Sequence, residues 1–315
     1  VYNGSKRLKT IEQEKLNNRV ADLDVATSEN DIEQSIAQVY IQILYAAESV
    51  KVNENTLQVS EAQRDRGKQL LDAGSIARSD YAQLEAQVST DRYQLVTAQA
   101  TLQDYKLQLK QLLELDGEQE MQVYLPALGD ENVLSPLPTK TDVFRSAVAL
   151  RPEIEASKLS VEASELGIGI AKSGYLPSVS LTAGIGTNHT SGSDFTFGEQ
   201  VKNGWNNSIG LSISVPIFNN RQTKSAVEKA KLQYQTSQLT LLDEQKTLYK
   251  TIEGLWLDAN SAQQRYAAAI EKLHSTQTSY ELVSEQFNAG MKNTVELLTE
   301  KNNLLQAQQE LLQSK

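Results

Sequence analysis

The chain has 315 residues, a net charge of −10 at pH 7, a hydrophobic fraction of 39% and no cysteine. The negative charge argues against a nucleic-acid partner, because phosphate binding requires clustered Lys and Arg. The lack of cysteine excludes disulfides and thiolate metal sites. The hydrophobic fraction is low for one large globule, and long stretches free of Gly and Pro are typical of extended, packed helices.

The chain opens with Val1-Tyr2-Asn3-Gly4, which resembles the end of a strand rather than a leader sequence. No signal peptide is visible, and no run of about 18 apolar residues predicts a transmembrane helix. We therefore expect the sequence to begin inside a structural element of a longer protein.

The first predicted unit covers residues 1–115 and holds a helical hairpin. Between Ser5 and Arg66 the chain contains neither Gly nor Pro, and apolar residues recur every seven positions, which predicts a very long helix with an a/d-type seam. Its seam consists of Ile32, Ile36, Val39, Ile43, Ala46, Val50 and Leu57. Gly74 predicts the turn, and the returning helix carries Val88, Leu95, Leu102 and Leu109.

Residues 116–150 read as an irregular side element because Pro126, Pro136 and Pro138 interrupt it. A short strand is expected at residues 121–124. Thr141-Asp142 predicts the cap of a short helix that ends at Ala149.

Residues 151–174 predict a helix that begins at Pro152, and residues 175–218 predict a β-hairpin. In the hairpin, apolar residues alternate with Ser, Thr, Gly and Asn over two strands of about ten residues. This pattern matches outer-membrane barrel strands, although a half-buried hairpin on a soluble core also fits it. The residues expected to face lipid are Val179, Leu181, Ile185, Trp205, Ile209, Leu211, Ile213 and Val215.

Residues 219–315 predict a second helical hairpin with its turn at Gly290, and this hairpin repeats the first. Phe218, Ala289 and Gly290 correspond to Tyr2, Ala73 and Gly74 at a constant offset of 216 residues. The long period indicates duplication of a half-domain. One β-hairpin cannot cross a bilayer with unpaired edges. Duplication supplies four strands per full-length chain, whereas a barrel needs about eight, so several chains must contribute.

Five segments, in the right order, resemble the TolC-like outer membrane efflux protein family. They are Leu150-Arg151-Pro152-Glu153-Ile154, Gly174-Tyr175-Leu176-Pro177, Val215-Pro216-Ile217-Phe218-Asn219, and the turns at Ala73-Gly74 and Ala289-Gly290. The resemblance implies a mostly α fold of long antiparallel helical hairpins that form a periplasmic tunnel. It also implies a homotrimer with a 12-stranded barrel in the outer membrane of a Gram-negative bacterium, and an equatorial collar to which residues 116–150 would contribute as the equatorial element.

The same resemblance implies that the helical tips close the tunnel and meet a periplasmic adaptor protein coupled to an inner-membrane pump. Untwisting of the tips would open the passive duct for efflux or type I secretion. Asp80 resembles an acid of the entrance latch and Glu296 an acid of the constriction. Phe287 stands where some members carry Tyr, and Lys292 could pair with Asp80 or Glu296. The candidate tip residues are Gly74, Ser75, Ile76, Asp80, Phe287, Gly290, Met291, Lys292 and Glu296.

Catalysis is not expected, because His189 and His274 have no nucleophile or metal-spaced ligands in a motif with them. No cofactor or metal site is predicted. The competing interpretation is a coiled-coil scaffold or adaptor, or a helical pore-former. The strand hairpin and the duplication favour the duct, because an adaptor needs only one coiled hairpin.

Overall fold

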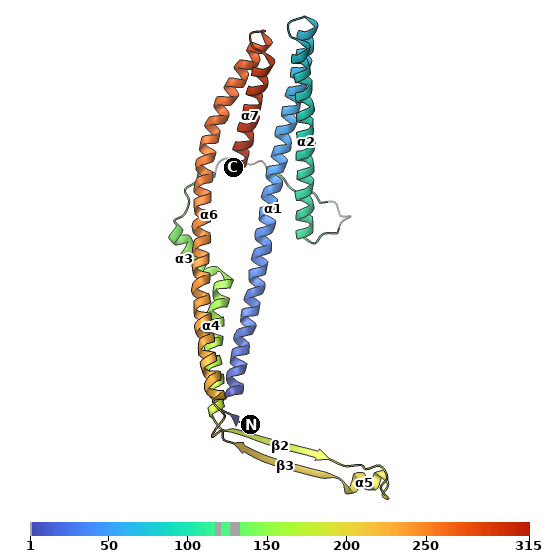
Figure 1. Ribbon diagram of the computed structural model, residues 1–315, viewed down its shortest axis with the longest axis vertical. Helices are drawn as coiled ribbons and strands as arrows, with labels where there is room; N and C mark the ends of the chain where they lie inside the picture. The colour runs from blue at the N-terminus through green and yellow to red at the C-terminus, as the bar shows by residue number, and fades with distance from the viewer. Residues whose placement is uncertain (1, 117–120, 127–132) are drawn as a thin grey trace. The chain divides into compact units, whose positions relative to one another are not determined.

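The computed structural model describes residues 2–116, 121–126 and 133–315. Helices dominate it and one small antiparallel sheet accompanies them, which confirms the mostly α fold class (Figure 1). Its contacts form two units, one from residues 1–27 and 144–250 and one from residues 28–143 and 251–315. The two longest helices, α1 (Lys6–Asp72) and α6 (Gln222–Asn288), contribute to both units.

The two-fold repeat is confirmed residue by residue. Both bounds of α6 lie 216 residues after those of α1, and α7 (Thr294–Ser314) starts 216 residues after α2 (Arg78–Leu112). The backbone before each long helix is also alike. Gly4 and Ser5 have φ of 63° and 64°, and their equivalents Asn220 and Arg221 have φ of 51° and 62°.

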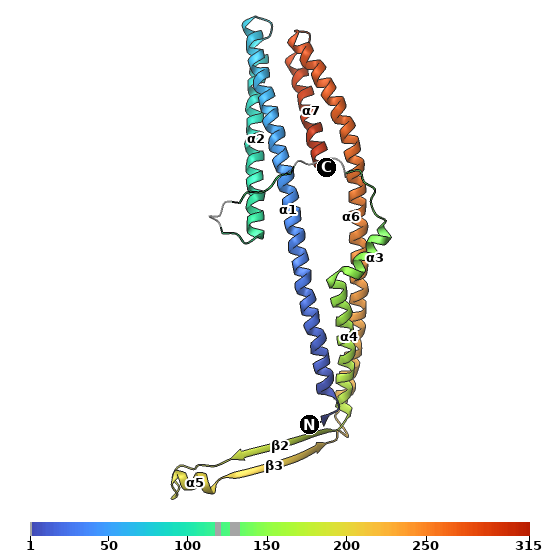
Figure 2. The ribbon, with the colours of Figure 1, turned by 180° about the vertical axis from the view of Figure 1, so that it is seen from behind.

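The first unit contains the sheet, in the order β1 (Tyr2–Asn3), β2 (Ser178–Gly186) and β3 (Asn206–Ser214). The short helix α5 (Phe197–Asn203) lies at the closed end of the β2–β3 hairpin (Figure 2). Each long strand has nine residues, close to the expected length of about ten. Trp205 and Val215 lie just outside β3, because the ladder ends at the pairs Gly186–Asn206 and Ser178–Ser214.

The helix α4 (Pro152–Lys172) packs between the first turns of α1 and α6 in the same unit. Pro152 occupies the first turn, where its missing N–H has no intrahelical acceptor to lose. Gln13 donates to the Ala163 carbonyl at 2.8 Å, and the hydroxyls of Ser164 and Ser237 lie 2.8 Å apart. A 3₁₀ turn (Ser173–Tyr175) then leads into β2.

The second unit contains both helical hairpins, α1–α2 and α6–α7. Each turn ends the preceding helix with a left-handed glycine, Gly74 at φ 74° and Gly290 at φ 76°. Gly74 and Ser75 donate to the carbonyls of Leu71 and Leu70, and Gly290 and Met291 donate to those of Phe287 and Gln286. This double bond pattern is the Schellman motif, which satisfies the last carbonyls of a helix.

The predicted seam of α1 is only partly buried within one chain. Ile43 and Ala46 are 0% and 3% exposed, whereas Ile32 is 51% exposed. Apolar faces of the long helices therefore stay open to solvent in the single chain. Among the described residues, no helix combines the length and hydropathy that a membrane span requires.

The segment 116–150 leads to the helix α3 (Lys140–Leu150). Two expectations there were wrong. Thr141-Asp142 does not cap the helix, because Thr141 lies inside its first turn. The cap is Thr139, whose hydroxyl accepts from the Asp142 N–H. Residues 121–124 form no strand; the Tyr124 carbonyl accepts from the Tyr40 hydroxyl at 2.8 Å instead of from a neighbouring strand.

Trp256 anchors this segment to α6, donating to the Pro138 carbonyl at 2.9 Å, with the Lys140 ammonium 4.9 Å from its ring centroid. The parts of the expected equatorial element at 117–120 and 127–132, and the expected strand residue Val1, lie outside the described residues.

Replacing Gly290 with Ala should lower the free energy of unfolding by about 1–2 kcal/mol, because an L-residue resists the left-handed conformation. A Cβ at Gly290 would meet no atom within 4 Å, so the cost comes from the backbone alone. The matched control is Gly254→Ala in the middle of α6, also in open space, which should gain about 0.5–1 kcal/mol. Urea unfolding of both variants measures the two changes in the free energy of unfolding. Equal changes would contradict the assignment of a left-handed backbone to Gly290.

Candidate functional site

The two turns at the hairpin ends present small and apolar side chains to solvent. Gly74 and Ser75 are exposed at the first turn, and Ile76 is half-buried. At the second turn, Met291 is 72% exposed and Val295 is 57% exposed. Each turn therefore offers exposed small or apolar side chains, beside charged residues, at the end of a hairpin whose helices fix its position.

Lys292 and Glu296 form an ion pair at the second turn. The Lys292 ammonium lies 2.5 Å from Glu296 Oε1, while the other carboxylate oxygen accepts from the Asn293 N–H at 3.2 Å. The Asn293 side chain accepts in return from the Glu296 N–H at 2.9 Å, which completes a capping box. The bond from Lys292, followed by that from Asn293, lowers the pKa of Glu296. Lys292 thus pairs with Glu296 and not with Asp80.

Asp80 has the equivalent position at the first turn. Its carboxylate accepts from the Ala77 N–H at 3.2 Å and so caps the start of α2. Because Ala77 has no side-chain oxygen, only half of the capping box exists there. Within one chain, Asp80 is a helix-capping acid.

Phe287 lies in an apolar cluster beneath the tips. The ring is 2% exposed and packs with Leu84 and Leu297, which are 1% and 0% exposed. Leu84 comes from α2 and Leu297 from α7, so the cluster joins the two hairpins. Gly67 of α1 permits this packing, because a Cβ there would meet Leu84 Cδ1 at 2.3 Å.

A buried charged cluster, which we call the clasp, joins the hairpins farther from the tips. It consists of Ser60 on α1, Asp91 on α2 and Lys301 on α7, which are 2%, 1% and 3% exposed. The Lys301 ammonium donates to Asp91 and to Ser60, and the Ser60 hydroxyl donates to the same Asp91 oxygen. Gln87 donates to the other carboxylate oxygen at 2.9 Å.

Burial lowers the pKa of Lys301, while the hydrogen bond and charge of Asp91 act in the opposite direction. Removing one partner of a buried ion pair typically costs about 3–5 kcal/mol, because the remaining charge is left without compensation. Exposed pairs such as Lys292–Glu296 contribute little, and this one lies within the second hairpin. The clasp, by contrast, is a buried ion pair that joins α2 of the first hairpin to α7 of the second.

The β2–β3 hairpin in the first unit has two chemically different faces. The register pairs Val179 with Ile213 and Leu181 with Leu211 on one face, and Ser180 with Ser212 on the other. The apolar face is open, since Leu211 is 68% exposed and Ile209 is 83% exposed. In the loop, His189 packs edge-on against Phe197 at 5.2 Å and approaches Gln200 at 3.1 Å.

A family model described as "Outer membrane efflux protein" matches residues 143–315, more than half of the chain. The chain belongs to the outer membrane efflux protein family. The match covers α4, the β-hairpin and the second helical hairpin, and the 216-residue repeat relates the first helical hairpin to the second.

Two relatives in this family match nearly the whole chain. The outer membrane efflux protein BepC of Brucella suis biovar 1 (strain 1330) is 25% identical over 288 residues, covering 91% of this chain and 60% of BepC. The outer membrane protein TolC of Escherichia coli (strain K12) is 25% identical over 305 residues, covering 93% and 60%. The chain thus spans about three fifths of the length of these relatives.

The fold also matches a solved member of the group. A crystal structure of CusC, described in connection with folding and transmembrane channel formation, has a TM-score of 0.84 at 20% identity. The match covers 99% of this chain and 71% of CusC. This likeness extends the family's fold to the first helical hairpin.

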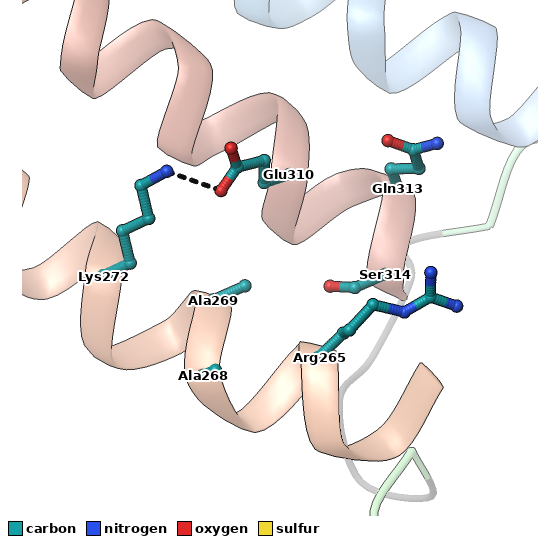
Figure 3. Close-up of a pocket in the computed structure, with 7 residues that line it drawn as sticks. All are labelled: Arg265, Ala268, Ala269, Lys272, Glu310, Gln313 and Ser314. Carbon is teal, nitrogen blue, oxygen red and sulfur yellow. Dashed lines mark hydrogen bonds and ion pairs between the residues drawn. The ribbon is translucent and has the colours of Figure 1, made fainter. Parts of the chain in front are cut away.

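One open pocket of about 400 Å³ lies between α6 and α7 (Figure 3). Ala268 and Ala269 make its floor, and Lys272 pairs with Glu310 at 2.7 Å across it. Arg265 reaches along its far side (Figure 3). No nucleophile hydrogen-bonded to a base lines this pocket, and no cluster of three His, Asp or Glu with metal-binding geometry occurs in the described ranges.

The sequence reasoning missed the clasp, although a signal existed. Asp91 stands in the apolar seam of α2 between Val88 and Leu95, and Lys301 stands in that of α7 between Leu297 and Leu304. Opposite charges in two facing seams predict a buried pair.

Replacing Lys292 with Gln should raise the pKa of Glu296 toward its ordinary value, because the ammonium is the main cause of the shift. Since the folded pKa is lowered, the pair stabilises the tip above the unfolded pKa and is lost as the pH falls through the folded value. The Glu296 carboxyl ¹³C shift, assigned with Glu296→Gln, checks this by NMR titration. Lys292→Arg keeps the charge and should keep the low pKa; identical titrations in Gln and Arg variants would contradict the assignment.

Proposed function

We propose that this chain is the main part of a passive exit duct in the outer membrane of a Gram-negative bacterium. The β-hairpin contributes to the membrane barrel, and the helical hairpins form a periplasmic tunnel. The two-faced β2–β3 hairpin carries the proposal most directly, because its open apolar face needs lipid and its polar face needs water.

The three-stranded sheet is incomplete by itself. Its order β1-β2-β3 leaves the outer side of β3 without a partner strand in the described part of the chain. Unpaired backbone groups are costly in lipid, so the sheet must close on further strands. Two hairpins per full-length chain supply four strands, and three chains supply the twelve of the family's barrel. The proposed assembly is therefore a homotrimer.

The hairpin tips would form the periplasmic entrance. Ser75, Met291 and Val295 are exposed there and suit contacts with the hairpins of a periplasmic adaptor protein. An inner-membrane pump would supply the energy and choose the cargo. Gly74 and Gly290 would fix the turns, and Asp80, Lys292 and Glu296 would carry the charges that surround the closed entrance.

The duct fits the chain better than a coiled-coil scaffold or adaptor does. A scaffold gives no role to a nine-residue strand pair with an exposed apolar face. A helical pore-former leaves the same hairpin unexplained. The proposed role is transport without catalysis.

A charge on the apolar face should prevent assembly of the full-length protein in the outer membrane. Leu211→Arg places a guanidinium on that face, at a cost of about 2–4 kcal/mol near the bilayer midplane. Ser212→Arg puts the same charge on the adjacent residue, on the face proposed to line water. The measurements are the amount of trimer extracted from outer membranes and the export of a fluorescent pump substrate by intact cells.

We expect Leu211→Arg to lose both trimer and export and Ser212→Arg to retain the trimer. Equal tolerance of the two variants would remove the barrel from the proposal. Loss of trimer in Ser212→Arg alone would invert the assignment of the two faces.

A further inference from the structure

The clasp differs from the long helices and the glycine turns because the repeat does not reproduce it. At the 216-residue offset, Ser60 corresponds to Thr276, Asp91 to Ala307 and Lys301 to Glu85. Ala307 is fully buried and Glu85 is exposed, so the equivalent positions contain no ion pair. The bounds of α1 and α6 and the two glycine turns repeat, whereas the clasp occupies one of the two equivalent sets of positions in the described residues.

The contacts between the clasp and the tips are of a weaker kind. Leu84, Phe287 and Leu297 join the hairpins through apolar packing, which is not directional. The Gln63 amide donates to the Tyr280 hydroxyl at 2.8 Å, a bond between neutral groups. The Arg66 guanidinium donates to the Asn288 carbonyl at 3.3 Å, but Arg66 is exposed and water can replace this bond. None of these contacts leaves an isolated charge in the interior when the helices shift.

The clasp resists separation of the two hairpins more strongly than the contacts on its tip side do. Its ammonium and carboxylate are almost fully buried, and each has its hydrogen bonds to Ser60 or Gln87. Pulling α7 away from α1 and α2 would leave both charges without partners in a poorly hydrated interior. The part of α2 from Arg78 to Asp91 is roughly 20 Å long. This part, on the tip side of the clasp, is long enough to swing while Asp91 stays in place.

We propose that the clasp stays closed while the tips separate, and that it is the pivot of the opening. The proposal rests on the proposed function as a gated duct. It confines the movement to the ends of the hairpins, near residues 61–90 and 281–300. Beyond the clasp, the two hairpins of one chain move as one body.

The test uses the full-length protein in cells. Residues 1–315 contain no cysteine, and any cysteine elsewhere in the full-length protein is first replaced with Ser. One variant carries Asp91→Cys and Lys301→Cys, and a second carries Ser79→Cys and Met291→Cys at the tips. A short bifunctional methanethiosulfonate bridges each pair, and a reductant releases it. The four single-cysteine variants, treated alike, control for modification without bridging.

Bridging at the tips should abolish export, and bridging at the clasp should leave export intact. Loss of export in both bridged variants, restored by the reductant, would overturn the pivot and leave the gated duct standing. Export that persists in the tip-bridged variant would overturn the gate itself and the pivot with it. These outcomes distinguish failure of the inference from failure of the proposed function.

Hydrogen exchange on the unmodified trimer gives a second test if the clasp cysteines impair folding. Amides of α2 near Asp91 should exchange about tenfold or more slowly than those between Arg78 and Leu84, because opening of the tip leaves the clasp closed. Uniform exchange along this part of α2, or faster exchange at Asp91 than at the tip, would overturn the proposal.

Discussion

Unpaired backbone at the edge of the sheet is the constraint on which the rest of the structure depends. A β-hairpin satisfies its backbone only on the inner side, and lipid offers no hydrogen bonds to the outer side. The β2–β3 hairpin also exposes Ile209 and Leu211 on one face. In the proposed duct, these strands are completed by a closed barrel that several chains build together. Assembly would then be a consequence of hydrogen bonding, and the exposed stripe on α1 around Ile32 agrees with it.

Duplication explains how one chain could supply near-equivalent parts to the proposed ring. The left-handed glycines at 74 and 290, the helix bounds and the acids Asp80 and Glu296 all recur at one offset. The interior polar chemistry does not recur, because Asp91 and Lys301 face each other where the repeat has Ala307 and Glu85. The repeated helices therefore carry an ion pair at one set of equivalent positions and none at the other.

Patterns with a local physical cause could be predicted from the sequence. Pro-free stretches with a seven-residue repeat predicted the long helices, Gly74 and Gly290 predicted the turns, and strict alternation predicted the two faces of the β-hairpin. The predicted strand at residues 121–124 was wrong. A strand needs a neighbouring strand to pair with, and the local sequence does not show whether one lies nearby. The clasp was missed for a similar reason, since its residues meet only through the packing of three helices.

The most direct test of the account is the mass of the full-length protein extracted from outer membranes in mild detergent. Light scattering corrected for bound detergent gives the number of chains. The account predicts three, because three chains complete the strands that one chain leaves open. A monomer, or a protein recovered only in the soluble fraction, would contradict it and return the chain to a coiled-coil scaffold.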